Sequence, residues 1–276
     1  MNPERIDQHY TFGDNDRAAA RLELLAEVFE PTTRVFVVRA LGFLERAPRR
    51  ALDLGAGPGH TTRLLGEILP GVEFTGLDNS ARYVELARAR HAAFPRLRFE
   101  RVDVQTETFA ASSVDFVYCR HLLVHLPDPE GALRRAQAAL TPQESTQKTS
   151  STSLVALEET AGLRSPDPAF TLYYQTVERM QAHYGQRMFL GASLDEVARR
   201  AGLEVLDARI ERTLVCPQKM ARLHLDNLRT FRDDAFVKAS VDVDVLARLE
   251  RSLTEVATGT RAAPPVEVEL GQVIAR

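Results

Sequence analysis

A glycine-rich turn carries the strongest chemical signal in the sequence. It reads Asp53-Leu54-Gly55-Ala56-Gly57-Pro58-Gly59 and comes directly after the apolar run that starts at Arg50. Alternating glycines allow a tight turn and let a ligand approach the backbone with no Cβ in the way. The helix expected next adds unpaired N–H groups at its N-terminus. The turn therefore predicts a ligand site at Asp53, Gly55, Ala56 and Gly57, a device that nicotinamide and flavin enzymes also use.

Two acidic positions further along the chain suit the same site. Asp78, followed by Asn79, ends the second expected strand roughly 20 residues after the turn, the interval at which a carboxylate accepts from ribose hydroxyls. Asp103 follows the third expected strand, where its carboxylate can accept from an adenine amino group while Val104 packs on the ring. The alternatives are surface capping for Asp78 and an ordinary loop role for Asp103.

Arg120 and His121 come at the end of the fourth expected strand. Open sheets bind ligands in the crevice outside the carboxyl ends of their strands, so both side chains are predicted to face that crevice. Histidine is also the commonest general base, which makes His121 and His183 the candidates for a catalytic role. For His183 the alternative is a surface histidine.

The elements that position these residues alternate along the chain. Strands are expected at 50–54, 72–77, 96–102, 114–119, 154–157, 203–214 and 266–274, and helices at 16–47, 61–68, 81–93, 129–140, 169–184, 193–201 and 220–255. Pro31 is expected to start a second helix within the first helical stretch, because proline suits the first turn of a helix. The polar run 143–153 is expected to be a surface loop. Alternation of this kind predicts an α/β fold with a doubly wound, mostly parallel sheet.

Composition narrows the class of partner. The chain has 276 residues, a formal net charge of -3 and two cysteines, Cys119 and Cys216. A net negative charge argues against a nucleic-acid partner, and two cysteines without metal-ligand spacing fit a reducing cytoplasm. The first ten residues lack the apolar stretch of a signal peptide, and no window reaches the roughly 20 apolar residues of a membrane span. We expect a soluble, cytoplasmic protein.

Taken in order, DLGAGPG, LDNS, RVDV and CRHLLVHLPDP resemble the motifs of class I, Rossmann-like methyltransferases that use S-adenosylmethionine (SAM). The resemblance covers roughly residues 50–159. It implies a seven-stranded sheet with an antiparallel last strand, SAM as cofactor and S-adenosylhomocysteine as product. It also implies that the SAM site is lined by Gly55, Gly57, Asp78, Asp103, Val104 and Arg120.

The N-terminal block Tyr10 to Arg17 is similar to actinobacterial natural-product methyltransferases, among them the prenyl C-methyltransferases of teleocidin-type indole alkaloids. That resemblance implies that Tyr10 and Phe12 cover the methionine end of SAM; an anchor for the first helix is the alternative. The expected division is a helical lid at 1–48, a SAM-binding core at 49–160 and, at 161–276, a helical cap interleaved with the last strands. Helical termini outside the core also allow a homo-oligomer.

The acceptor is expected to be a small hydrophobic molecule, with no metal ion required. Four aromatic residues of the predicted cap are candidates for binding it: Phe170, Tyr173, Tyr174 and Tyr184. Their faces could stabilise a cation formed on a methylated carbon, although packing between helices explains them as well. Methylation of oxygen or nitrogen remains an alternative. So do a nicotinamide oxidoreductase, against which the missing Tyr-x-x-x-Lys pair argues, and a SAM-binding protein without catalysis.

Overall fold

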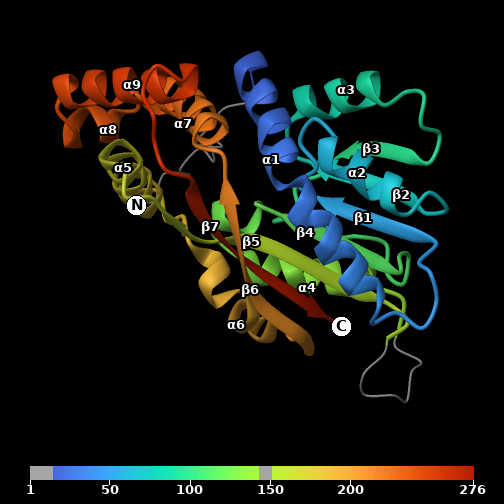
Figure 1. The fold of residues 1–276 in the computed structure, drawn as a ribbon. Coiled ribbons are helices and arrows are strands. Elements are labelled where there is room, and N and C mark those ends of the chain that lie inside the picture. The colour runs from blue at the N-terminus through green and yellow to red at the C-terminus, as the bar shows by residue number, and fades with distance from the viewer. Residues whose placement is uncertain (1–14, 143–150) are drawn as a thin grey trace, which may run out of the picture.

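The computed structural model describes residues 15–142 and 151–276, and within them seven strands form one sheet (Figure 1). The sheet order is β3-β2-β1-β4-β5-β7-β6. The strands are β1 (Arg50–Leu54), β2 (Glu73–Asp78), β3 (Leu97–Arg101), β4 (Phe116–Arg120), β5 (Leu154–Arg164), β6 (Val205–Val215) and β7 (Val266–Ala275). Strands β1 to β5 are parallel, and β7 runs antiparallel to both of its neighbours. The predicted doubly wound sheet with an antiparallel last strand is confirmed.

Helices cover both faces of the sheet and one end of it. They are α1 (Asp16–Leu41), α2 (His60–Ile68), α3 (Ala81–Arg90), α4 (Pro129–Ala139), α5 (Pro168–His183), α6 (Leu194–Arg200), α7 (Pro217–Phe231), α8 (Ala235–Ser240) and α9 (Val243–Thr258), with short 3-10 turns at Leu123–His125 and Leu190–Ser193. One apolar cluster joins α1 and α2 to the sheet, and another joins α4 and α6 to its other face.

We call α5, α7, α8 and α9 the cap. Helix α5 follows the carboxyl end of β5 and α7 follows that of β6, so the cap stands at the end of the sheet where the parallel strands finish. Helix α1 packs against both α7 and α2, and in Figure 1 it stands between the cap and the helices beside β2 and β3. This one helix therefore joins the cap to the glycine-turn side of the sheet. None of the helices in the described ranges is long and apolar enough to cross a membrane.

The prediction that Pro31 starts a second helix is wrong, because α1 continues unbroken through this residue. A proline inside a helix removes the hydrogen bond to the carbonyl four residues earlier, here that of Glu27. Pro31 and Glu27 are both exposed, so water can bind that carbonyl. The buried face of the helix, with Phe29 and Thr33 on either side of the proline, is kept continuous.

The end of the polar run 143–153 also differs from its predicted role as a surface loop. Ser151, Thr152 and Ser153 are buried. The Ser151 N–H donates to the carbonyl of Phe43, and the Ser153 hydroxyl donates to the carbonyl of Thr141 at 2.7 Å. Serine and threonine hydroxyls can satisfy backbone groups on the way into a strand, and here they lead directly into β5.

Candidate cofactor and acceptor site

The glycine turn has the backbone geometry that its sequence predicts. Gly55, Gly57 and Gly59 all have positive φ, at 71°, 53° and 85°, a region that side chains with a Cβ rarely adopt. A Cβ on Gly55 would come within 3.0 Å of Leu122, and one on Gly57 would meet Leu22 of α1 at 3.4 Å. The side chains of Leu122, which follows β4, and of Leu22 in α1 therefore lie against the backbone of the turn.

Asp78 connects this turn to the end of β2. Its Oδ2 accepts from the N–H of Gly57 at 2.8 Å, and its Oδ1 accepts from the N–H of Ser80 at 2.9 Å. The carboxylate thus lies directly against the turn, as the ribose assignment requires. It also binds the backbone N–H of Ser80, the N-cap residue of α3, so the capping alternative describes part of its role as well.

Asp53 is buried below the turn. The Thr62 hydroxyl donates to its Oδ2 at 2.6 Å. Burial raises the pKa of the Asp53 carboxyl to about 7, against the opposing effects of Thr62 and the Arg120 guanidinium. A carboxyl that is half-ionised near neutral pH favours a positively charged ligand group beside it, because the cation stabilises the ionised form.

Asp103, Val104 and Asn79 lie at the ends of the neighbouring strands. Val104 is buried, whereas Asn79 is exposed and its carbonyl accepts from Arg101 Nε at 3.1 Å. The Asp103 Oδ1 accepts from the N–H of Gln105 at 2.9 Å, which is a loop role. Adenine contact by Asp103 and Val104 stays a prediction.

Arg120 lies at the same end of the sheet but turns toward the helices. Its Nη1 donates to the Thr33 hydroxyl of α1 at 3.0 Å, and its Nη2 donates to the Thr61 hydroxyl of α2 at 2.8 Å. The buried guanidinium thus ties the two helices together beside the turn. The structure gives Arg120 a clear role in holding this edge, and direct contact with the cofactor stays a prediction.

A buried carboxylate that sequence reasoning missed completes this arrangement. The Glu158 Oε2 accepts from the Thr33 hydroxyl at 2.7 Å and from the Tyr118 hydroxyl at 2.9 Å, and its Oε1 accepts from Gln272 Nε2 at 2.7 Å. Because Thr33 also accepts from Arg120, it links the charges of Glu158 and Arg120. The signal was present in the sequence: Glu158 and Glu159 interrupt an otherwise apolar central strand, where an acidic side chain must find partners.

His121 follows β4 in a left-handed backbone conformation, with φ at 53°. Such residues are uncommon outside glycine and concentrate at functional sites. Its ring packs edge-on against that of Phe29 in α1, with ring centroids 5.2 Å apart. Burial lowers the pKa of His121 to about 3, so the imidazole is neutral. Its buried Nε2 has no hydrogen-bond partner among residues 15–142 and 151–276. A neutral histidine of this kind can accept a proton or a hydrogen bond from an acceptor molecule.

Glu159 is a second titratable group at this end of the sheet that sequence reasoning did not single out. Its Oε1 accepts from the N–H groups of Leu122 and Leu123, at 3.0 and 2.7 Å. Burial raises the pKa of the carboxyl to about 8. The carboxyl therefore holds the segment that follows His121, directly beside the glycine turn.

The four aromatic residues predicted to bind the acceptor fall into two groups. Phe170, Tyr173 and Tyr174 are buried together in the cap, with Tyr173 and Tyr174 edge-to-face at 5.8 Å. Tyr184 lies beyond the end of α5 and donates its hydroxyl to Asp234 at 2.6 Å. A helix rises about 1.5 Å per residue, which puts Tyr184 roughly 15 Å along the axis from Tyr174. The structure therefore separates Tyr184 from the other three, and binding of the acceptor by these residues stays a prediction.

His183, the other catalytic candidate, belongs with Tyr184. It is exposed and stacks on Phe236 of α8, with ring centroids 4.3 Å apart. The structure does not bring it together with His121 or the buried aromatic residues, and its catalytic role stays a prediction. Tyr10 and Phe12, predicted to cover the methionine end of the cofactor, lie outside the described residues.

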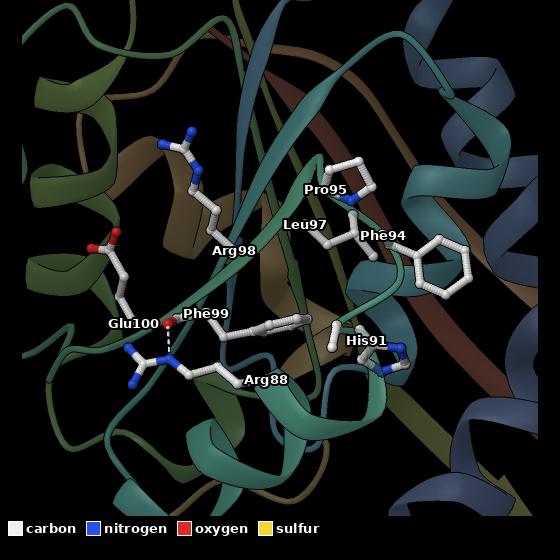
Figure 2. A pocket seen from close by; sticks show the side chains of 9 residues that line it. Arg88, His91, Phe94, Pro95, Leu97, Arg98, Phe99 and Glu100 are labelled. Atoms are coloured by element: carbon white, nitrogen blue, oxygen red, sulfur yellow. Dashed lines mark hydrogen bonds between the residues drawn. The ribbon is translucent and has the colours of Figure 1, made fainter.

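A surface pocket of about 390 Å³ lies away from this arrangement, between α3 and the edge strand β3 (Figure 2). Figure 2 shows Arg88 reaching the strand, where its Nε donates to the carbonyl of Phe99 at 2.8 Å. The residues lining this pocket include none of those predicted for the cofactor. The candidate site is thus the covered edge of the sheet at the glycine turn, and this pocket is separate from it.

The geometry fits SAM. A turn with glycine at every second position, an acidic residue at the end of the next strand and a buried carboxyl suit a ligand that carries a ribose diol and positive charge. Asp78 and the backbone of Gly55 to Gly57 would hold it, with Asp53 nearby. SAM supplies an activated methyl group on its sulfonium.

Comparison with known proteins agrees with this fit. Residues 52–143 match the family model described as a methyltransferase domain. A trans-aconitate 2-methyltransferase of Methylobacterium radiotolerans is 37% identical over 133 residues, which are 48% of this chain and 44% of that protein. A phosphoethanolamine N-methyltransferase of Haemonchus contortus, solved with S-adenosylhomocysteine, superposes with a TM-score of 0.55 at 16% identity, covering 99% of this chain and 61% of that one. The cyclase SpnF superposes with a TM-score of 0.54 at 19% identity, covering 88% and 80%.

The sheet and the glycine turn have the class I, Rossmann-like form, and residues 52–143 match a methyltransferase domain. The match spans less than half the length of these curated relatives. It covers 44% of the Methylobacterium radiotolerans protein and 35% of a second trans-aconitate 2-methyltransferase, from Variovorax paradoxus. The structural neighbours, at under 20% identity, share the fold, and one of them is a cyclase. The acceptor and the reaction therefore have to be argued from this chain's own residues.

Proposed function

We propose that the chain transfers the methyl group of SAM to a small, largely hydrophobic metabolite. The observation that carries this proposal is the hydrogen bond from the Gly57 N–H to Asp78, which joins the glycine turn to the ribose-binding position. The sulfonium methyl is already activated, so the chain's own residues mainly have to align the acceptor and exclude water. The burial of Phe29, Tyr173 and Phe170 beside this end of the sheet supports such a water-poor setting.

Within that proposal, His121 is the candidate base. For a hydroxyl or amine acceptor, its buried Nε2, which has no hydrogen-bond partner within the described residues, could accept a hydrogen bond from the attacking atom, and the pKa of about 3 makes it a weak base for the proton itself. For a carbon acceptor no base is needed before transfer, and aromatic faces would stabilise the cation. C-methylation of a prenyl or terpenoid indole alkaloid in natural-product biosynthesis is the specific form that the N-terminal resemblance supports. O- or N-methylation of another small molecule is the alternative.

A carboxylate acceptor is a second candidate. The curated relatives include several proteins named trans-aconitate 2-methyltransferase. Arg21 of α1 is only 4% exposed, and its positive charge acts on both His121 and Tyr173. A buried cation at this point would suit an acidic acceptor better than an apolar one.

The first test measures which cofactor stabilises the protein. A ligand present at 100 times its dissociation constant stabilises the fold by about 2.7 kcal/mol, which is readily seen in thermal unfolding. We expect SAM and S-adenosylhomocysteine to stabilise the protein and NAD not to. Stabilisation by NAD alone would support a nicotinamide oxidoreductase. SAM binding without turnover of any acceptor would support a SAM-binding protein that lacks catalysis.

The second test removes the residue that carries the proposal. Asp78→Ala deletes the acceptor for the ribose diol and for Gly57, and we expect the dissociation constant for SAM to rise by about 10–100-fold. Calorimetry measures this dissociation constant. The control is Asp128→Ala, which also removes an aspartate bound to a helix start, here that of α4, outside the glycine turn. Unchanged affinity would contradict the assignment.

A homo-oligomer is also part of the proposal, and a single-chain mass by light scattering would contradict it.

A further inference from the structure

The cap contains a polar cluster inside its apolar core. Two members, Tyr173 and Tyr174, come from α5, and two, His224 and Asn227, come from α7. His224 is 3% exposed and Asn227 is 7% exposed. Both occupy the buried face of α7, on the same stripe as Met220, Leu228 and Phe231, where a helix that served only for packing would carry apolar residues.

The contacts fix the geometry of the cluster. The His224 ring stacks on Tyr173 with centroids 4.0 Å apart and planes at 18°. His224 Nε2 is hydrogen-bonded to the Tyr174 hydroxyl at 3.1 Å, and Asn227 Nδ2 donates to the Tyr173 hydroxyl at 2.8 Å. Phe170 closes one side, with its ring 5.7 Å from that of His224. The two polar residues of α7 are thus held in place by the two tyrosines of α5.

This network leaves two polar atoms unused. His224 Nδ1 and Asn227 Oδ1 are buried, and neither has a hydrogen-bond partner in the part of the chain that the structure describes. A buried polar atom without a partner costs about 1–3 kcal/mol, so such atoms in a native protein usually meet a ligand or an ordered water. The two atoms belong to residues on one stripe of one helix, one turn apart.

The cluster lies close to the candidate methyl-transfer site. Phe29 of α1 belongs to the same apolar cluster as Tyr173 and Phe170, and its ring also contacts His121. The charge of Arg21 acts on both Tyr173 and His121. Phe29 of helix α1, which Figure 1 shows beside the cap, therefore links the apolar cluster around these residues to His121, the residue after β4.

The cluster suits an uncharged group. His224 is kept neutral by burial, which lowers its pKa to about 3, and burial raises the pKa of both tyrosines above the usual value. A cationic group would lose its hydration here and gain no opposite charge from these four side chains, whereas the counter-charge for an anionic group is that of Arg21, which acts on Tyr173 from α1. The amide oxygen of Asn227 can only accept, so the ligand group must donate.

We propose that His224 and Asn227 recognise one uncharged hydroxyl or N–H group on an otherwise apolar methyl acceptor. This inference rests on the proposed methyl transfer and specifies its substrate class. Asn227 Oδ1 accepts the ligand's proton, and His224 Nδ1 contacts the ligand heteroatom or its neighbour. The remaining body of the acceptor packs against the aromatic residues, Phe170 among them.

The test uses two probes of the same shape, phenol and toluene, added to the full chain saturated with S-adenosylhomocysteine. Thermal unfolding and calorimetry report binding. We expect phenol to bind at least about tenfold more tightly than toluene, because toluene leaves the two polar atoms unpaired. Asn227→Leu, close in size, should abolish this preference while S-adenosylhomocysteine binds as before. Arg222→Leu, an exposed residue of the same helix, should retain it.

His224→Phe provides a second variant that keeps the ring stacked on Tyr173, in case Asn227→Leu fails to fold. Equal binding of phenol and toluene, binding of neither, or a preference that survives both substitutions would overturn the inference. So would tight binding of trans-aconitate that does not depend on Asn227. Failure of the proposed function is a separate result, because it would appear in the unsubstituted chain as no binding of SAM and S-adenosylhomocysteine, or as SAM binding without turnover of any acceptor.

Discussion

Replacement of Thr33 by valine tests whether the buried Glu158 network holds α1 in place. Thr33 is fully buried, and its hydroxyl donates to Glu158 and accepts from Arg120. Valine has nearly the same shape but removes both hydrogen bonds. Glu158 keeps Tyr118 and Gln272 as donors, and the Arg120 Nη2 keeps Thr61. The loss is therefore one bond to each of two buried charges, which costs about 2–4 kcal/mol in the free energy of unfolding.

For a chain of this size, a loss of that magnitude lowers the melting temperature by about 4–8 °C, measurable by scanning calorimetry. Thr32→Val is the matched control. The Thr32 hydroxyl only donates to the carbonyl of Phe29, on a less buried side of the same helix turn. Its replacement should change stability by no more than about 0.5 kcal/mol. If the two variants melt together, the network does not stabilise the fold as argued, and Thr33 is an ordinary helix residue.

The remaining predictions concern the cofactor side. Because the pKa of Asp53 is raised to about 7, the free protein loses stability as the pH rises through 7, and binding of cationic SAM should weaken as the pH falls below 7. Calorimetry from pH 8 to 5.5 measures this dependence; Asp53→Asn should remove it, and an unchanged slope in that variant would contradict the assignment. Gly55→Ala meets both a positive φ and Leu122 at 3.0 Å, so it should destabilise the fold by about 1–2 kcal/mol or more and weaken SAM binding. Gly71→Ala, with no atom within 4 Å, should be neutral or slightly stabilising, and equal melting temperatures for the two would refute the geometric argument.

Local chemistry made the cofactor half of the fold predictable. Glycines at alternate positions report a backbone requirement that lies within a few residues. The observed helix α3 begins after Ser80, which accepts from the N–H of Tyr83, at the start expected for that helix. Pro31 misled because its effect depends on exposure, which a sequence window does not reveal.

The acceptor side was less predictable because its contacts join distant segments. Thr33 meets Glu158 across 125 residues, and Tyr173 meets Asn227 across 54. The aromatic pattern of α5 includes the three buried rings and also Tyr184, which lies beyond the end of the helix and outside the buried cluster. His224 and Asn227 could have been found in the sequence as polar residues on the apolar stripe of an amphipathic helix.

One helix accounts for why the cofactor is better determined than the reaction. Helix α1 is hydrogen-bonded to β5 through Thr33 and packs into the cap through Phe29. It therefore contacts both the sheet and the apolar cluster of the cap. On the sheet side, Thr33 of that helix meets Arg120, which lies within the residues that match a methyltransferase domain, and Glu158, which lies outside them. The cap side meets α5 and α7, which lie outside the matched residues 52–143. A cyclase and a methyltransferase can share the first part and differ in chemistry. Specificity in this protein therefore has to be sought where α1 contacts the cap, at the stripe formed by His224 and Asn227.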